Sequence, residues 1–147
     1  MSNASRPEKL SVVVFSGEFE KVHYALVMAS GAAAIGTPVT LFFTMGACRA
    51  LLAAGADGRA AWRSMPAGEG FADGGAMDDA FAARTCATFE ELFSACVELG
   101  VRFMVCDMGL RALDLENEPM RGDVTIDTGV VVTFLNDASR DGAMLFV

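Results

Sequence analysis

The side chains best suited to covalent chemistry in this 147-residue chain are four cysteines and a single histidine. A cysteine thiolate is a nucleophile, a metal ligand and a carrier of oxidised sulfur. No two cysteines have the two-residue gap of a zinc knuckle or a thioredoxin-type motif, and a single histidine argues further against a zinc site. We therefore expect thiols that act singly, with no metal and no cofactor. The five residues are Cys48, Cys86, Cys96, Cys106 and His23.

The elements that would position these residues alternate between strand and helix. This alternation predicts a mostly parallel sheet with helices on both faces. Apolar residues make up 53% of the chain, which fits a sheet buried on both faces, an oligomer, or both. We predict one domain, residues 10–147, after a flexible lead-in of residues 1–9. The predicted strands are 10–15, 38–45, 101–106, 124–126 and 143–147, and the predicted helices are 18–36, 47–54, 88–99, 108–115 and 129–139.

Residues 55–84 interrupt this alternation. The segment contains six glycines and one proline, and no helical or strand period persists in it beyond one or two helical turns at 77–83. Its Gly74-Gly75 pair matches neither a dinucleotide fingerprint nor a P-loop. Long irregular segments of this kind are usually functional, so we expect a flexible lid or a subunit contact.

Charge and hydropathy exclude two classes of partner. The net charge is −8, and the 11 lysines and arginines are too scattered for a phosphate-binding stripe, so we expect no nucleic acid. Acidic charge also argues against an anionic membrane surface. No stretch approaches the ~20 apolar residues that span a bilayer, and the polar first residues do not resemble a secretory signal. A cytoplasmic location, with reduced thiols, is the expectation.

Cys106 has the most favourable position for chemistry. Sites in parallel sheets lie at the carboxyl ends of the strands, where the loops 16–21, 44–49 and 106–111 are predicted to meet. Cys106 ends a strand directly before a helix, whose first amides and dipole would stabilise a thiolate. Asp107 opposes that thiolate, and Arg111, one helical turn on, could offset Asp107. Position alone equally allows Cys106 to be a small buried apolar residue.

The other candidates have a structural alternative as well. His23, near the start of the first helix, could be a proton shuttle or the ion-pair partner of a thiolate, but a structural role is favoured. Cys48 follows the second strand at the same sheet edge and could be a resolving or relay thiol, against the simpler interpretation of a packing residue. Cys96 lies on the apolar face of its helix, and Cys86 has no evident partner.

Four segments resemble a known family in their order and spacing. Residues 99–108, LGVRFMVCDM, resemble the strand that presents the active cysteine in the DsrE/DsrF-like sulfur-carrier family, and they are most similar to its peroxiredoxin-like DsrE branch. Residues 15–21, 39–44 and 129–147 resemble the same branch. After the cysteine, family members tend to carry serine or threonine with methionine, whereas this chain has Asp107-Met108-Gly109.

The resemblance implies a fold and a function. The fold is a three-layer α/β/α sandwich with a five-stranded, mostly parallel sheet of flavodoxin-like appearance, in oligomers that are often trimers or hexamers. The function is that of a sulfur carrier or sulfurtransferase-like protein, in which Cys106 accepts sulfane sulfur as a persulfide. Its partners would be sulfur donor and acceptor proteins or small thiols. The alternatives are a non-covalent small-ligand or nucleotide-binding module, and an oligomeric assembly protein with a vestigial site.

Overall fold

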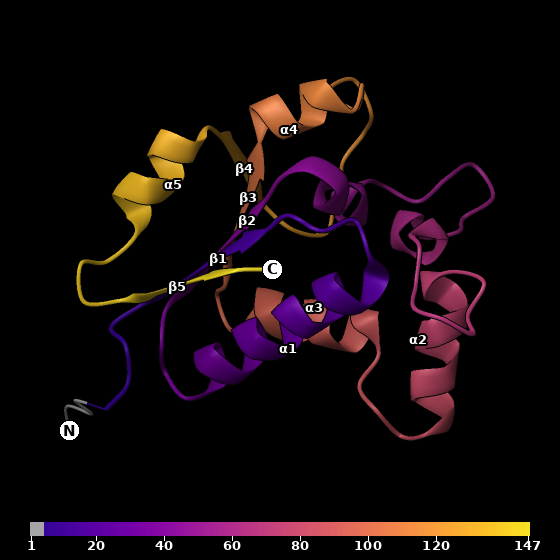
Figure 1. Ribbon diagram of the computed structural model, residues 1–147, viewed down its shortest axis with the longest axis horizontal. Helices are drawn as coiled ribbons and strands as arrows, with labels where there is room; N and C mark the ends of the chain where they lie inside the picture. The colour runs from indigo at the N-terminus through magenta and orange to yellow at the C-terminus, as the bar shows by residue number, and fades with distance from the viewer. Residues whose placement is uncertain (1–4) are drawn as a thin grey trace.

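A five-stranded sheet organises the computed structural model, which describes residues 5–147 (Figure 1). All four strand pairings are parallel, in the order β4-β3-β2-β1-β5. This confirms the predicted α/β fold. The strands are β1 (Leu10–Val14), β2 (Val39–Phe43), β3 (Arg102–Cys106), β4 (Ile126–Gly129) and β5 (Ala143–Phe146). The helices are α1 (Phe19–Ala34), α2 (Gly74–Ala83), α3 (Phe89–Glu98), α4 (Asp107–Ala112) and α5 (Val131–Asp137), with 3₁₀ turns η1 (Met45–Leu51) and η2 (Ala61–Ser64).

The two faces of the sheet are covered unequally. Helices α1 and α3 cover one face, and α5 lies on the opposite face (Figure 1). The central strand β2 is buried along its whole length, as its apolar run VTLFF predicts for a strand covered on both sides. Leu41 and Phe43 of β2 belong to the large core under α1 and α3. Phe42 belongs to a smaller cluster under α5.

The large core forms because α1 and α3 each present an apolar face to the sheet. Phe19, Val22 and Leu26 of α1 are fully buried there. Helix α3 begins where its capping residue predicts, since the Thr88 hydroxyl accepts a hydrogen bond from the Glu91 amide at 3.3 Å. Among the described residues, no helix combines the length and apolar character needed to cross a membrane.

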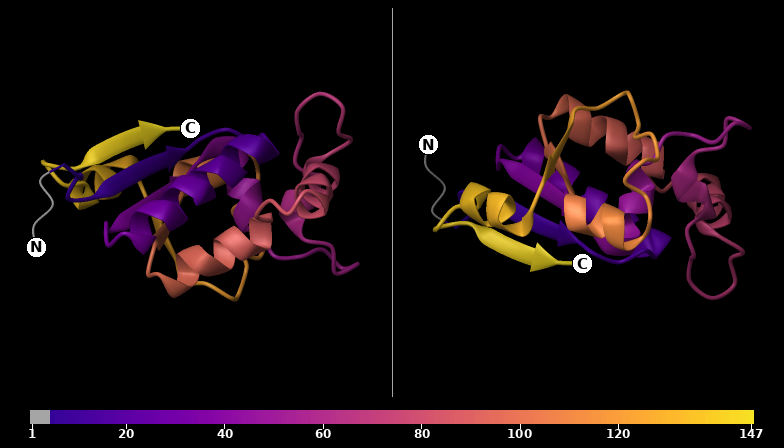
Figure 2. Two further views of the ribbon diagram at one scale, coloured as in Figure 1. Left: turned by 90° about the horizontal axis from the view of Figure 1, so that it is seen from below. Right: turned by 90° about the horizontal axis from the view of Figure 1, so that it is seen from above.

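Residues 55–84 are more ordered than their composition suggests. They extend from the carboxyl side of the sheet at one end of the molecule (Figure 2) and contain η2 and α2. The helix predicted at 77–83 begins earlier, at Gly74, because the Asp73 carboxylate accepts a hydrogen bond from the Ala76 amide at 2.9 Å. Aromatic contacts attach the segment to α1, with Phe19 lying 5.5 Å from Trp62 and 6.1 Å from Phe81 between ring centroids.

The fourth strand lies later than the predicted 124–126. Its register with β3 fixes the correct bounds, with Ile126 beside Phe103 and Gly129 beside Cys106. The sequence of this strand, IDTG, has no apolar run because it is an edge strand with one open side. The bounds of β4 are therefore determined by its pairing with β3 and not by local strand propensity.

Helix α5 is attached to the sheet at two points. Its one buried residue, Phe134, stacks on Phe42 with ring centroids 4.9 Å apart. At its last residue, the Asp137 carboxylate accepts hydrogen bonds from Thr40 Oγ1 at 2.6 Å, Lys9 Nζ at 2.6 Å and Arg102 Nη1 at 2.7 Å. Lys9 comes from the predicted lead-in 1–9, of which residues 1–4 lie outside the described residues.

The Asp137 contacts predict a pH-dependent stability. Burial alone would raise the pKa of Asp137, but the donors from Lys9, Thr40 and Arg102 outweigh it and hold the pKa below its ordinary 3.8. Because the folded-state pKa is lowered, the stabilisation is present above pH 3.8 and is lost as the pH falls through the folded-state pKa. Asp137→Asn should lower the free energy of unfolding at neutral pH by about 1–3 kcal/mol.

Urea unfolding from about pH 7 down to about pH 2 tests this. The difference between wild type and Asp137→Asn should shrink as the carboxyl group is protonated. A difference that stays constant through the acid range would mean that the Asp137 charge does not hold α5.

Candidate functional site

Three glycines bring the loops after β1, β2 and β3 into backbone contact. A Cβ atom on Gly46 would lie 2.8 Å from Gly17 Cα, and one on Gly109 would lie 2.6 Å from the Met45 nitrogen. Contacts this short leave no room for a side chain. Met45, between these contacts, has a left-handed φ of 49°, which is unfavourable for a non-glycine residue. The three loops predicted to meet at the carboxyl edge therefore do meet.

Cys106 is the last residue of β3 and the residue before α4. Its side chain is 4% exposed and belongs to the small cluster with Phe42, Met104 and Phe134, under α5. Beside it, a surface depression of 490 Å³ lies between α4 and the residue that precedes α5. The cysteine is thus at the predicted edge, close to a surface opening but covered. The depression is lined by Asp107, Met108, Arg111, Ala112 and Val130.

Arg111 forms an ion pair with Asp107. The Arg111 Nε donates to Asp107 Oδ2 at 3.0 Å, and its Nη2 contacts the same oxygen. This pairing raises the pKa of Arg111. The negative charge next to Cys106 is therefore matched by a positive charge one helical turn away, although both groups are substantially exposed to solvent and screened by it.

Cys48 is close enough to Cys106 for negative charge on Cys106 to affect its pKa. It lies in η1, is fully buried, and its Sγ is 3.8 Å from the Phe43 carbonyl oxygen. Burial, and to a lesser extent negative charge on Cys106, raise the pKa of Cys48 to about 12. A thiol with that pKa is protonated at neutral pH and is a poor nucleophile. The structure brings the two cysteines to one edge but leaves Cys48 in the core.

His23 lies on the other side of the sheet. Its Nε2 is 2.9 Å from the Ala87 carbonyl oxygen, and its ring centroid is 4.8 Å from that of Phe81. These contacts join α1 to α2 and to the loop before α3, whereas the Cys106 side chain faces α5. The structural role favoured for His23 accounts for all of them.

The remaining two cysteines, Cys96 and Cys86, do not lie at the carboxyl edge of the sheet. Cys96 is buried between α1 and α3, with Sγ 3.7 Å from the Leu26 carbonyl oxygen. Burial raises the pKa of Cys96 to about 12. Cys86 is exposed in the loop before α3. Within residues 5–147, no group of three or more His, Cys, Asp or Glu side chains is arranged to hold a metal ion.

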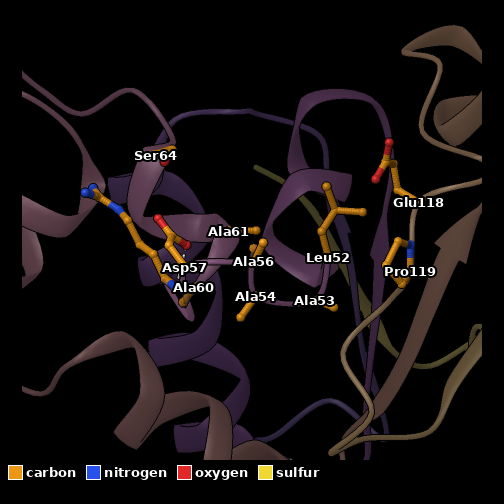
Figure 3. Close-up of a pocket in the computed structure, with 12 residues that line it drawn as sticks. Leu52, Ala53, Ala54, Ala56, Asp57, Ala60, Ala61, Ser64, Glu118 and Pro119 are labelled. Carbon is orange, nitrogen blue, oxygen red and sulfur yellow. Dashed lines mark hydrogen bonds between the residues drawn. The ribbon is translucent and has the colours of Figure 1, made fainter.

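A separate cavity of 510 Å³ lies between residues 52–64 and the turn at Glu118 and Pro119 (Figure 3). Five of its twelve lining residues are alanine. Two of its charged side chains have partners within the protein. Asp57 accepts a hydrogen bond from the Arg59 amide, and the Arg59 guanidinium pairs with Asp73. None of its lining residues belongs to the three loops that meet at the carboxyl edge, so we do not place the chemistry there.

The fold and site define an α/β protein with a cysteine at the carboxyl edge of a parallel sheet. The sequence model of the DsrE/DsrF/DrsH-like family matches residues 6–51. A curated relative, the uncharacterized protein YrkE of Bacillus subtilis, is 27% identical over 157 aligned positions that cover 95% of this chain and 97% of the relative.

A solved structure shares the fold. The crystal structure of the ychN protein from E. coli superposes with a TM-score of 0.57 at 13% identity, covering 95% of this chain and 99% of that one. The match over residues 6–51 supports the DsrE/DsrF-like family predicted from the sequence, and the shared fold agrees with it. The narrower assignment to the peroxiredoxin-like DsrE branch stays a prediction.

Sequence reasoning missed the glycines and the cover over the cysteine. The glycines did leave a signal, because Gly17, Gly46 and Gly109 each stand three positions after the last residue of their strand. Phe134 left none, since the sequence VVTFLND contains three other large apolar residues, all of which are exposed.

Adding one methyl group at Gly109 should test the loop contacts. In Gly109→Ala the new Cβ would meet the Met45 nitrogen at 2.6 Å and Thr44 Oγ1 at 2.7 Å, so we expect a loss of about 1–3 kcal/mol in the free energy of unfolding. Gly31→Ala is the matched control, because nothing lies within 4 Å of its Cβ in the last turn of α1. It should leave the free energy of unfolding unchanged or raise it slightly, because alanine favours the helix over glycine. Equal effects of the two changes in urea unfolding would contradict the close approach.

Proposed function

We propose that this protein is a sulfur carrier of the sulfurtransferase type that holds sulfane sulfur as a persulfide on Cys106. The observation that carries the proposal is the position of Cys106 at the carboxyl end of β3, beside the depression lined by α4 and Val130. Ligands of parallel sheets bind at this edge. Similarity to the DsrE/DsrF-like family over residues 6–51 supports sulfur relay in general.

The chemistry needs only thiols and a sulfane sulfur. In loading, the Cys106 thiolate attacks the outer sulfur of a donor persulfide, R–S–SH. A bond forms between Cys106 Sγ and that sulfur, the S–S bond of the donor breaks, and the donor leaves as R–S⁻. In unloading, a partner thiolate attacks the terminal sulfur and Cys106 leaves as the thiolate. No external oxidant or reductant is consumed, and the acceptor is a protein or a small thiol.

The two buried thiols, Cys48 and Cys96, do not compete for this role. The pKa of about 12 of Cys48 and of Cys96 leaves both protonated at neutral pH. A persulfide on Cys106 is therefore not readily resolved by Cys48, which favours hand-over to a partner and not internal release of sulfide.

Intact-protein mass spectrometry after incubation with polysulfide tests the proposal. Wild type should gain about 32 Da per sulfur atom on Cys106, and a reducing thiol should remove the added mass. Cys106→Ser and Cys106→Ala should lose this adduct, while Cys48→Ser should retain it. Peptide mapping assigns the site, and circular dichroism verifies that each variant is folded. Sulfur that loads equally on Cys86 or persists in both Cys106 variants would refute the assignment.

We further propose that the protein is a homo-oligomer, a trimer or a hexamer. The proposal rests on the part of the sheet face beside α5 that no helix covers. Phe146 and Met144 of β5 are exposed, and Phe146 pairs with exposed Phe15 at 5.2 Å between centroids. An apolar surface of this kind is typical of a protein interface.

A single charge should disrupt that interface. Phe146→Asp is expected to shift the protein to a smaller species in size-exclusion chromatography with light scattering, because burying an unpaired carboxylate is costly. Tyr24→Asp is the matched control, since Tyr24 is an exposed aromatic residue on α1, on the opposite side of the sheet. A wild-type protein that elutes as a monomer, or an unchanged mass in Phe146→Asp, would contradict the proposal.

A further inference from the structure

A thiol that exchanges sulfur has to be reached by the sulfur of its partner, yet Cys106 is almost completely buried. The other members of its cluster are Phe42 and Met104 from the sheet and Phe134 from α5. Phe134 is thus the one buried residue of the cluster that the sheet does not supply. From the α5 side, access to Cys106 Sγ requires α5 to move.

The opening beside Cys106 is also bounded by α5. The 490 Å³ depression has α4 residues on one side and Val130, the residue that caps the start of α5, on the other. A displacement of α5 would carry Val130 with it and would widen this depression toward Cys106. The cover and the wall of the opening are therefore parts of one short segment.

Helix α5 is weakly attached compared with the other helices. It has seven residues, whereas isolated helices shorter than about 12–15 residues are marginal in water. Only Phe134 is buried, and the apolar residues on its outer side are exposed. Segments with so few buried contacts open locally at low cost, without global unfolding.

Two attachments hold the helix closed. Near its middle, the Phe134 ring stacks on Phe42 at 4.9 Å. At its end, the Asp137 carboxylate accepts from Thr40, Lys9 and Arg102, which come from β2, the residue before β1, and β3. Val130 alone separates α5 from β4, and residues 138–142 separate it from β5, so a movement of α5 would turn on these two segments.

We propose that α5 is a movable cover that controls access to Cys106, closed by the Phe134 stack and the Asp137 carboxylate. The inference rests on the proposed function in one respect only: the purpose of the cover, which is to shield a sulfur-carrying thiol between donor and acceptor. It predicts that Cys106 reacts with external reagents through a transiently open state and not through a fixed channel.

Alkylation of the intact protein by iodoacetamide, followed by peptide mapping, measures this access. In Phe134→Ala the rate of alkylation at Cys106 should rise by about tenfold or more, the factor that corresponds to about 1.4 kcal/mol of closed-state stability. Leu135→Ala is the matched control, because Leu135 lies on the exposed side of the same helix, and its rate should not change. Cys96, buried between α1 and α3, reports global unfolding and should stay unreactive in all variants.

A second variant tests whether faster alkylation results only from the hole that the missing Phe134 ring leaves. Asp137→Ala removes the attachment at the end of α5 and leaves Phe134 in place, and it should also raise the Cys106 rate about tenfold. Asp141→Ala, at an exposed carboxylate in the turn that follows α5, is its control. A bulky maleimide should be accelerated in both α5 variants by the same factor as iodoacetamide, because an open cover admits both.

The contrary results are equally specific. Unchanged rates at Cys106 in folded Phe134→Ala and Asp137→Ala would overturn the cover. An acceleration limited to iodoacetamide in Phe134→Ala would indicate a packing hole, and a parallel rise at Cys96 would indicate global opening; either result would also overturn it. Because alkylation requires no persulfide, the cover and the sulfur-carrier function can fail independently.

Discussion

The parallel sheet must be buried on both faces, and this chain meets that requirement with very different means on the two sides. A central parallel strand such as β2 presents apolar side chains in both directions. On one side α1 and α3 supply a large core. On the other side α5 supplies one phenylalanine. The rest of that face is left to the solvent or to a neighbouring molecule, and the cysteine of the proposed site lies on this thinly covered side.

The position of the cysteine reconciles two demands that oppose each other. A sulfur carrier has to keep its thiol away from stray oxidants and still present it to a specific partner. A thiol in the large core would be inert, as the raised pKa of Cys96 illustrates. A thiol on an exposed loop, such as Cys86, would be accessible to any thiol-reactive molecule in solution. Cys106 lies between these extremes, at the end of a strand and under a short helix.

The sequence was sufficient for the features that depend on local pattern. The apolar runs at β1, β2 and β3 and the Thr88 cap predicted their elements, and the alternation of elements predicted the parallel sheet. It was not sufficient where tertiary contacts decide. The bounds of β4 depend on its register with β3, and α2 depends on a cap by Asp73 that its glycine-rich context obscured. The burial of Phe134 among exposed apolar neighbours depends on which side of α5 meets the sheet, and composition does not encode that.

The pairing of β1 with β5 has a consequence for synthesis on the ribosome. Leu10 pairs with Ala143, so the second neighbour of the first strand is made 133 residues after the strand itself. While translation proceeds, β1, β2 and β3 can pair in sequence order, but the free edge of β1 stays open until Phe146 has left the exit tunnel. An unpaired strand edge is a template for association with other chains. From the emergence of β1 until β5 is made, that edge is therefore available to chaperones or to neighbouring nascent chains.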